Sequence, residues 1–122
     1  MKRAVVLVDH GSRRGEANAL VDDLARALAP QLGRVVKTAH MEIAEPTLAQ
    51  AIDACVAEGA AEITVLPFFL APGRHTIEDV PVQAAAAAER HPGVTVRVAG
   101  PIGNHPGLVE ILHERLREAE GG

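Results

Sequence analysis

The sequence predicts an α/β fold, a three-layer sandwich built on a four-stranded parallel sheet. Short apolar runs rich in β-branched residues alternate with longer segments whose apolar residues recur at helical spacing, in the order βαβαβαβα. Gly33 and Gly59 end two of the helical segments. Chains that alternate in this way form a parallel sheet covered by helices on both faces, with right-handed crossovers.

The four strands are expected at residues 3–8, 34–41, 62–69 and 94–99. The first run is apolar throughout, as in a central strand, whereas the second carries Lys37 and Thr38, which suits an edge strand. This contrast favours the strand order 2-1-3-4, a truncated flavodoxin-like or chelatase-like lobe.

The four helices are expected at residues 15–32, 46–58, 79–90 and 106–119. Five consecutive alanines mark the third, and the others repeat apolar residues at helical spacing. Cys55 falls on the apolar stripe of the second helix, which predicts a small core residue. Because no second copy of any segment is apparent, residues 1–122 are interpreted as one domain.

Composition and charge narrow the classes of function. The 122 residues carry a formal net charge of −4, which argues against nucleic acid as a partner. A single cysteine allows no internal disulfide and is typical of a reducing compartment. No apolar run approaches the roughly 20 residues of a membrane span, and no secretion signal is visible. A cytoplasmic protein with no membrane partner is therefore expected.

Metal-ligating side chains follow three of the predicted strands. His10 follows the first, Glu42 ends the second, and His75 lies in the loop after the third. In the order 2-1-3-4 these ends share one edge of the sheet, at the switch point where ligands bind. Two imidazoles and a carboxylate make an open site for a borderline ion such as cobalt, iron, nickel or zinc. The alternative is two isolated loop histidines, and their combination with a carboxylate favours the site.

Polar residues around this edge suggest an acidic ligand. Arg13 and Arg74 offer planar donors for carboxylates, whereas Arg14 is expected to be plain surface. Ser12 belongs to no GxSxG motif, so it is expected to hydrogen-bond within its loop or to a ligand and not to act as a nucleophile. No GxGxxG or P-loop pattern supports a nucleotide cofactor.

Apolar residues end the third strand beside these arginines. Phe69 and Leu70 are the candidates for contact with a flat apolar ligand. Because successive strand residues face opposite sides, only one of Phe68 and Phe69 is expected to face that ligand. His40 lies two residues before Glu42 on the same strand face and is a possible auxiliary metal ligand.

A second carboxylate competes with Glu42 for the role of ligand. Glu45 directly precedes Pro46, and proline favours the first helical position. Glu45 is therefore expected at a helix entrance, where its charge is stabilised by the helix dipole, and Glu42 is the better ligand. Asp9 is expected to point away from His10. His91, His105 and His113 are interpreted as structural.

Four motifs resemble those of a known family. HGSR at 10–13, MEIAEPTL at 41–48, PFFLAPGRHTIEDVP at 67–81 and GNHPGL at 103–108 are similar to the short form of the sirohydrochlorin cobaltochelatases. These are class II chelatases, related to the sirohydrochlorin ferrochelatases. The resemblance extends in the same order over nearly the whole chain.

The resemblance implies that a divalent metal is inserted into sirohydrochlorin, a reduced tetrapyrrole with many carboxylates, without an energy cofactor. It places the metal and pyrrole chemistry on His10, His75 and Glu42, and it implies a homodimer. Cobalt is the favoured metal, with iron and nickel as alternatives. Two other hypotheses stay open: a non-catalytic tetrapyrrole or metal carrier, and a flavodoxin-like module that binds no metal.

Overall fold

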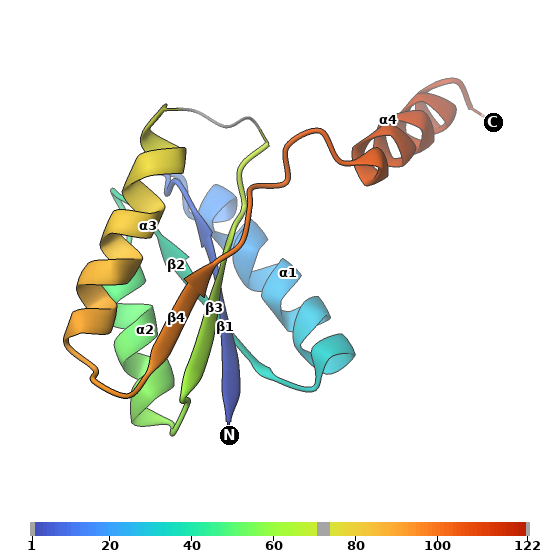
Figure 1. Ribbon diagram of the computed structural model, residues 1–122. Helices are drawn as coiled ribbons and strands as arrows, with labels where there is room; N and C mark the ends of the chain where they lie inside the picture. Colours follow the sequence, from blue (N-terminus) through green and yellow to red (C-terminus); the bar gives the residue numbers. More distant parts are fainter. Residues whose placement is uncertain (1, 71–73, 122) are drawn as a thin grey trace.

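A parallel sheet forms the centre of the molecule (Figure 1). The computed structural model describes residues 2–70 and 74–121, and of residues 74–77 it describes the backbone alone. The strands are β1 (Arg3–Asp9), β2 (Val35–His40), β3 (Glu62–Pro67) and β4 (Thr95–Val98). The helices are α1 (Gly15–Leu32), α2 (Leu48–Ala57), α3 (Arg74–Glu89) and α4 (Pro106–Ala119).

The strands lie in the order β2-β1-β3-β4, and all neighbours are parallel, which confirms the predicted topology. β1 is central, with Val6 paired to Lys37 on one side and to Val65 on the other. Residues 4–8 are buried, as expected for a strand covered on both faces. Parallel pairing brings the carboxyl ends of the strands to one edge of the sheet, where the candidate ligands were predicted to meet.

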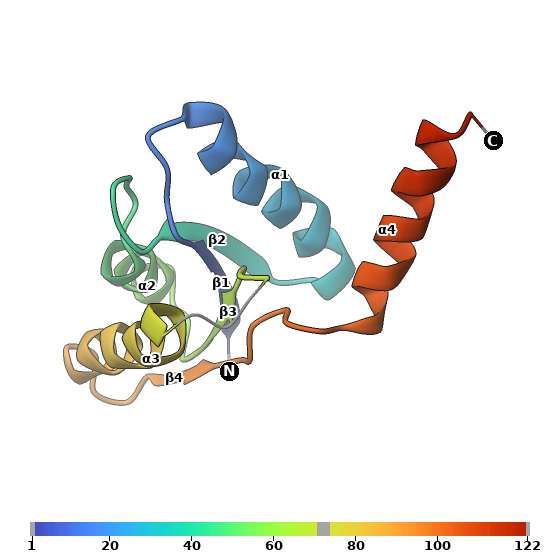
Figure 2. The same ribbon diagram turned by 90° about the horizontal axis from the view of Figure 1, so that it is seen from above.

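Helices cover the two faces of the sheet, α2 and α3 on one and α1 on the other (Figure 2). On the larger side, Ile52 of α2 and Val80 of α3 are fully buried in the core. Cys55 is 1% exposed, which confirms its predicted core position, and burial raises the pKa of its thiol. Cys55 therefore packs within the core and is shielded from solvent.

The face of α1 that touches the sheet is narrower than the sequence pattern suggested. Val21 and Ala25 are buried against Leu7. Leu20 and Leu24, which share the apolar pattern, are 49% and 37% exposed. They lie one position before the two buried residues, about 100° around the helix, and so flank the contact.

Two helices begin at residues other than those predicted. α3 begins at Arg74 and not at 79, so His75 lies in the first turn of a helix and not in a loop. The polar stretch at the start of α3 lacks the apolar periodicity on which the prediction relied. α2 begins at Leu48, after a capping box in which Thr47 and Gln50 bond each other's backbone N–H. Pro46 therefore precedes the cap.

α4 stands away from the sheet after an irregular segment that follows β4 (Figures 1 and 2). The structure describes every residue of α4, and none of them is buried. Leu108, Ile111, Leu112 and Leu116 form one apolar stripe along it, which we call the α4 stripe. A hollow of about 530 Å³ lies between this stripe and residues that follow β3. In the described part of the structure Ile111, Leu112 and Leu116 of this stripe are exposed, whereas Leu108 is half-buried.

No helix in the described part of the chain is long and apolar enough to cross a membrane. The cytoplasmic location expected from the composition stays a prediction.

Candidate functional site

The segments that follow β1 and β2 continue side by side beyond the strands. The N–H of Met41 donates to the carbonyl oxygen of Asp9 at 2.9 Å, and the N–H of Glu42 donates to that of His10 at 3.0 Å. β2 itself ends at His40, so Glu42 lies in the segment after the strand and not at its end. The backbone nevertheless holds Glu42 beside His10, and both side chains are exposed. The structure thus brings together two of the three predicted ligands.

Gly11 allows the two segments to approach this closely. Its φ is +92°, and a Cβ on it would lie 1.9 Å from the carbonyl oxygen of Glu42. The same Cβ would lie 3.2 Å from the Cβ of His40. Both the backbone conformation and the space at this position therefore require glycine.

We expect Gly11→Ala to push His10 and Glu42 apart and to destabilise the protein by more than backbone strain alone. Gly33→Ala is the matched control, because Gly33 also has a positive φ, +64°, but its Cβ would meet nothing within 4 Å. The control should lose only about 1–2 kcal/mol of unfolding free energy. Chemical denaturation measures both, and equal losses would show that the contact with Glu42 is unimportant.

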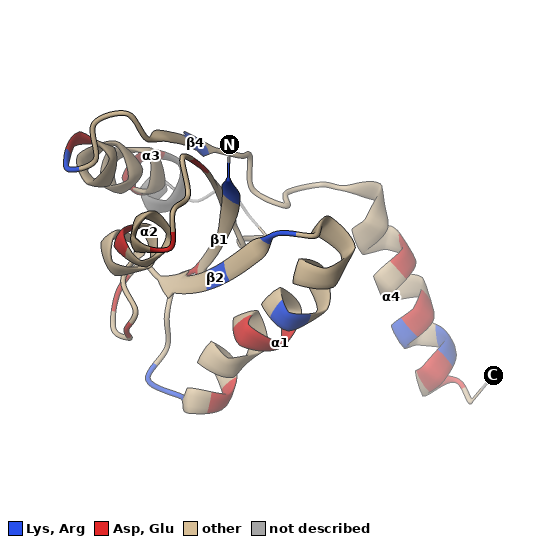
Figure 3. Cartoon of the chain, turned by 90° about the horizontal axis from the view of Figure 1, so that it is seen from below, with Lys and Arg blue, Asp and Glu red and all other residues tan. Residues whose placement is uncertain are grey.

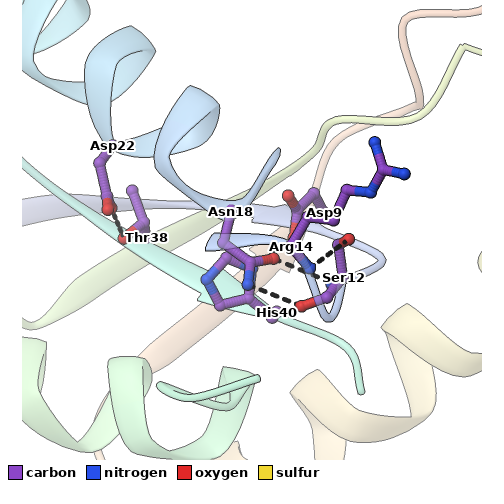
Figure 4. Close-up of polar contacts among 7 residues, drawn as sticks. All are labelled: Asp9, Ser12, Arg14, Asn18, Asp22, Thr38 and His40. Carbon is purple, nitrogen blue, oxygen red and sulfur yellow. Dashed lines mark hydrogen bonds and ion pairs between the residues drawn. The ribbon is translucent and has the colours of Figure 1, made fainter. Parts of the chain in front are cut away.

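A hydrogen-bonded pair, Asp9 and His40, adjoins His10 and Glu42 in the sequence. His40 is 3% exposed, and its Nδ1 lies 2.5 Å from Oδ1 of Asp9 (Figure 4). Asp9 and His40 face each other as the last register pair of β1 and β2. His40 was predicted as an auxiliary metal ligand, but in the structure Asp9 occupies its Nδ1. The pairing was not foreseen, although an acid and a histidine at the ends of neighbouring strands are a signal for it.

The loop between β1 and α1 is tied together by Ser12 and Asn18 (Figure 4). The N–H of Ser12 donates to Oδ1 of Asn18 at 2.8 Å, and Nδ2 of Asn18 donates to the carbonyl oxygen of Ser12 at 2.7 Å. The Ser12 hydroxyl accepts from the N–H of Arg14 at 3.0 Å, so the expected bond within the loop is present. Arg13 and Arg14 are exposed in the basic segment before α1 (Figure 3). Asn18, which no sequence motif singles out, thus fixes the conformation of this loop.

The two phenylalanines after β3 go to opposite faces. Phe69 is 4% exposed in the larger core cluster, and its ring centroid lies 4.4 Å from that of His10. Phe68 packs against the cluster beneath α1 and, with the exposed Leu70, lines the hollow beside the α4 stripe. Phe69 thus supports the His10 ring from within the core, and its contact with a ligand stays a prediction.

His75 and Arg74 occupy the first turn of α3, but their side chains lie outside the described residues. Their predicted roles therefore stay predictions. Among the side chains that the structure does describe, no three His, Cys, Asp or Glu residues are grouped to hold a metal ion. His10 and Glu42 offer an imidazole and a carboxylate, which together can bind a borderline divalent ion and accept protons.

The remaining histidines with described contacts have structural partners, as predicted. Nε2 of His91 lies 2.7 Å from Oδ1 of Asp53, a contact that, with Arg90, lowers the pKa of Asp53 and links α2 to the end of α3. His105 precedes α4, and its Nδ1 accepts from the N–H of Gly107 at 2.9 Å. His105 also lines the hollow beside the α4 stripe, together with Phe68 and Leu70.

Comparison with known proteins gives consistent matches over nearly the whole chain. The CbiX family model matches residues 4–119. The chloroplastic sirohydrochlorin ferrochelatase of Arabidopsis thaliana is 38% identical over 93% of this chain and 51% of its own length. The sirohydrochlorin cobaltochelatase of Methanopyrus kandleri is 31% identical over 97% of both chains.

A solved structure shows the same fold. The sirohydrochlorin chelatase SirB from Bacillus subtilis subspecies spizizenii, in complex with cobalt, superposes with a TM-score of 0.89 at 30% identity, over 97% of this chain and 51% of that chain. The chain therefore spans about half the length of SirB and of the Arabidopsis protein.

Proposed function

The chain belongs to the CbiX family, and we propose that it is a sirohydrochlorin chelatase that inserts a divalent metal ion into this tetrapyrrole without ATP. The observation that carries the proposal is the backbone pairing that sets His10 beside Glu42 at the carboxyl ends of β1 and β2. An exposed imidazole and carboxylate at that edge suit both capture of an ion and uptake of protons. The names of the Arabidopsis and Methanopyrus relatives support the substrate.

To insert a metal ion, the protein must bind the ion weakly enough to release it and must accept protons from the tetrapyrrole. The ion replaces two pyrrole N–H protons, so these must pass to a base as the new metal–nitrogen bonds form. Neutral His10, the Glu42 carboxylate and, by the sequence prediction, His75 hold the ion with positions left open for the pyrrole nitrogens. Glu42 or a histidine accepts the protons.

The substrate is held by the residues around these ligands. Arg13 and Arg74 bind carboxylates of the tetrapyrrole, since guanidinium groups match carboxylates in shape and charge. Leu70, which is 62% exposed, and Phe68 offer an apolar surface for the macrocycle. Ser12 and Asn18 keep the loop that carries Arg13 in place.

We favour cobalt as the metal. The Methanopyrus cobaltochelatase matches this chain along nearly all of both lengths. Iron is the alternative, because the Arabidopsis relative is a ferrochelatase, and nickel is also compatible with imidazole and carboxylate ligands.

The test is a metal-insertion assay with Co²⁺, Fe²⁺ and Ni²⁺ in parallel, under anaerobic conditions and without ATP. We expect the sirohydrochlorin absorbance to shift over many turnovers, with the highest kcat/KM for Co²⁺. A shift that stops at one metal per protein would indicate a carrier that uses the same site. A protein that binds neither Co²⁺ nor sirohydrochlorin would contradict both functions.

We also propose that two copies of the chain form the working enzyme. The α4 stripe is exposed, with Ile111 at 51%, Leu112 at 68% and Leu116 at 54% exposure. Ligand sites enclose most of a ligand's surface, and one open edge encloses little of a tetrapyrrole. A second copy supplies the other side of the tetrapyrrole site and covers the α4 stripe. A second lobe fused to the first would do the same in a chain of twice this length.

We expect the parent protein to sediment at twice its chain mass of 12.8 kDa, and Leu112→Glu to shift it to the monomer and slow metal insertion. A charge at the middle of the stripe is costly to bury between two copies. Glu110→Lys is the control, since Glu110 lies on the opposite side of α4. Sedimentation velocity decides the question, and a parent that is monomeric with full activity would contradict the dimer.

A further inference from the structure

The Asp9–His40 pair (Figure 4) is not used by the mechanism above, although both residues adjoin the candidate ligands in the sequence. The side chains of Asp9 and His40 are 17% and 4% exposed. Because so little of each side chain is exposed, neither has enough surface to bind a tetrapyrrole. Whatever the pair contributes to the reaction must therefore act through its neighbours.

The neighbours of the pair are the segments that carry the ligands. Asp9 directly precedes His10, and His40 lies two residues before Glu42. The N–H of His40 donates to the carbonyl oxygen of Pro46 at 2.9 Å, which ties down the far end of the segment that holds Glu42. Gly11 lies against the Cβ of His40 on the other side. A movement of either member of the pair is thus passed to both segments.

The pair lies at the carboxyl end of the β1–β2 pairing, and this position determines what its hydrogen bond can do. Asp9 and His40 form the last register pair of β1 and β2, and beyond them two backbone bonds, from Met41 to Asp9 and from Glu42 to His10, link the segments. Backbone at the end of a ladder opens more easily than the middle. A hydrogen bond from an imidazole to a buried carboxylate is strong, and loss of one partner leaves the other buried without compensation.

We infer that Asp9 and His40 are positioning residues of the metal site, which set the separation of His10 and Glu42. This inference rests on the proposed function, since it concerns the same site. The pair closes the end of the β1–β2 ladder with a side-chain bond, and the two ligands continue from it at a fixed spacing. Asp9 and His40 themselves touch neither the ion nor the tetrapyrrole.

The test compares Asp9→Ala with Asp9→Asn. The alanine variant removes the acceptor of the His40 Nδ1–H, whereas asparagine retains a carbonyl oxygen at the same place. We expect Asp9→Ala to lower kcat for cobalt insertion by about tenfold or more, with little change in KM for sirohydrochlorin. Asp9→Asn should recover most of the lost rate. Titration with Co²⁺ alone, followed by its visible absorption, should give a weaker or displaced spectrum for Asp9→Ala only.

Thr38→Val is the matched control for stability. Thr38 lies on the same strand as His40 and donates from its hydroxyl to Oδ1 of Asp22 at 2.6 Å, so valine also removes one side-chain hydrogen bond. We expect this variant to lose stability but to retain the parent kcat and cobalt spectrum. His40→Leu fills the buried site without the bond, and it replaces Asp9→Ala if that variant does not fold.

The outcomes separate the inference from the proposed function. If the parent inserts metal and Asp9→Ala or His40→Leu does so at the same kcat while folded, the pair is only structural and the inference is overturned. If Asp9→Asn is as slow as Asp9→Ala, a hydrogen bond that holds the segments is not the cause. If the parent inserts no metal, the proposed function fails, and the cobalt spectra then test the inference. Identical spectra for the parent and Asp9→Ala overturn the inference. A change confined to Asp9→Ala supports it.

Discussion

His10→Ala is expected to lower the rate of metal insertion by about 10²- to 10⁴-fold, the range found for loss of a positioned acid–base group. The fold should survive, because the His10 side chain is exposed and its described ring contact is with Phe69, at 4.4 Å between centroids. Loss of one such contact costs about 1 kcal/mol. Initial rates and thermal unfolding of the same preparation measure the two effects.

His113→Ala is the control for this experiment. His113 is an exposed histidine of α4 whose Nδ1 contacts Arg117, one turn further along the same helix. Its removal should leave the insertion rate unchanged. His75→Ala is expected to share the loss seen for His10→Ala, on the sequence prediction. Turnover of His10→Ala at the parent rate would show that this histidine neither binds the ion nor moves a proton.

The topology could be predicted from the sequence because it depends on patterns that each strand carries by itself. The apolar run of β1 requires cover on both faces, and Lys37 in β2 suits an edge, which places the two strands correctly. Parallel pairing then brings the carboxyl ends of both strands to one edge, where the backbone holds Glu42 beside His10. The proximity of His10 and Glu42 could therefore be predicted without knowledge of side-chain contacts.

Other features depend on contacts between distant segments and could not be predicted in the same way. The Asp9–His40 bond requires the register of β1 on β2, which no single strand specifies. The bonds of Asn18 to Ser12 require the path of a loop. An amphipathic pattern predicted α4, but periodicity does not say which surface covers its stripe.

The start of α3 shows where local patterns fail. The first turn of α3 contains Arg74 and His75, polar residues that carry no apolar repeat, so the pattern begins only further along the helix. The backbone of His75 therefore lies in a helical turn and not in the predicted loop.

Glu42→Gln is expected to abolish metal insertion or to slow it by about 10²-fold or more, with little change in melting temperature. The amide has the shape of the carboxylate but neither its charge nor its basicity. It therefore binds a divalent ion weakly and accepts no pyrrole proton. The side chain is exposed, and the bond that holds Glu42 beside His10 comes from its backbone N–H, which the substitution leaves in place.

Glu45→Gln is the control, because the structure gives Glu45 a different task. Its Oε2 accepts from Nε2 of Gln50 at 2.8 Å, and Gln50 in turn accepts from the N–H of Thr47, so Glu45 supports the cap of α2. We expect this variant to keep most of its activity and to lose at most about 1 kcal/mol of stability. Initial rates and thermal unfolding of both variants decide between the two carboxylates. If Glu45→Gln is the inactive variant and Glu42→Gln is active, Glu45 is the carboxylate that reaches the metal, and the segment after β2 must turn to bring it there.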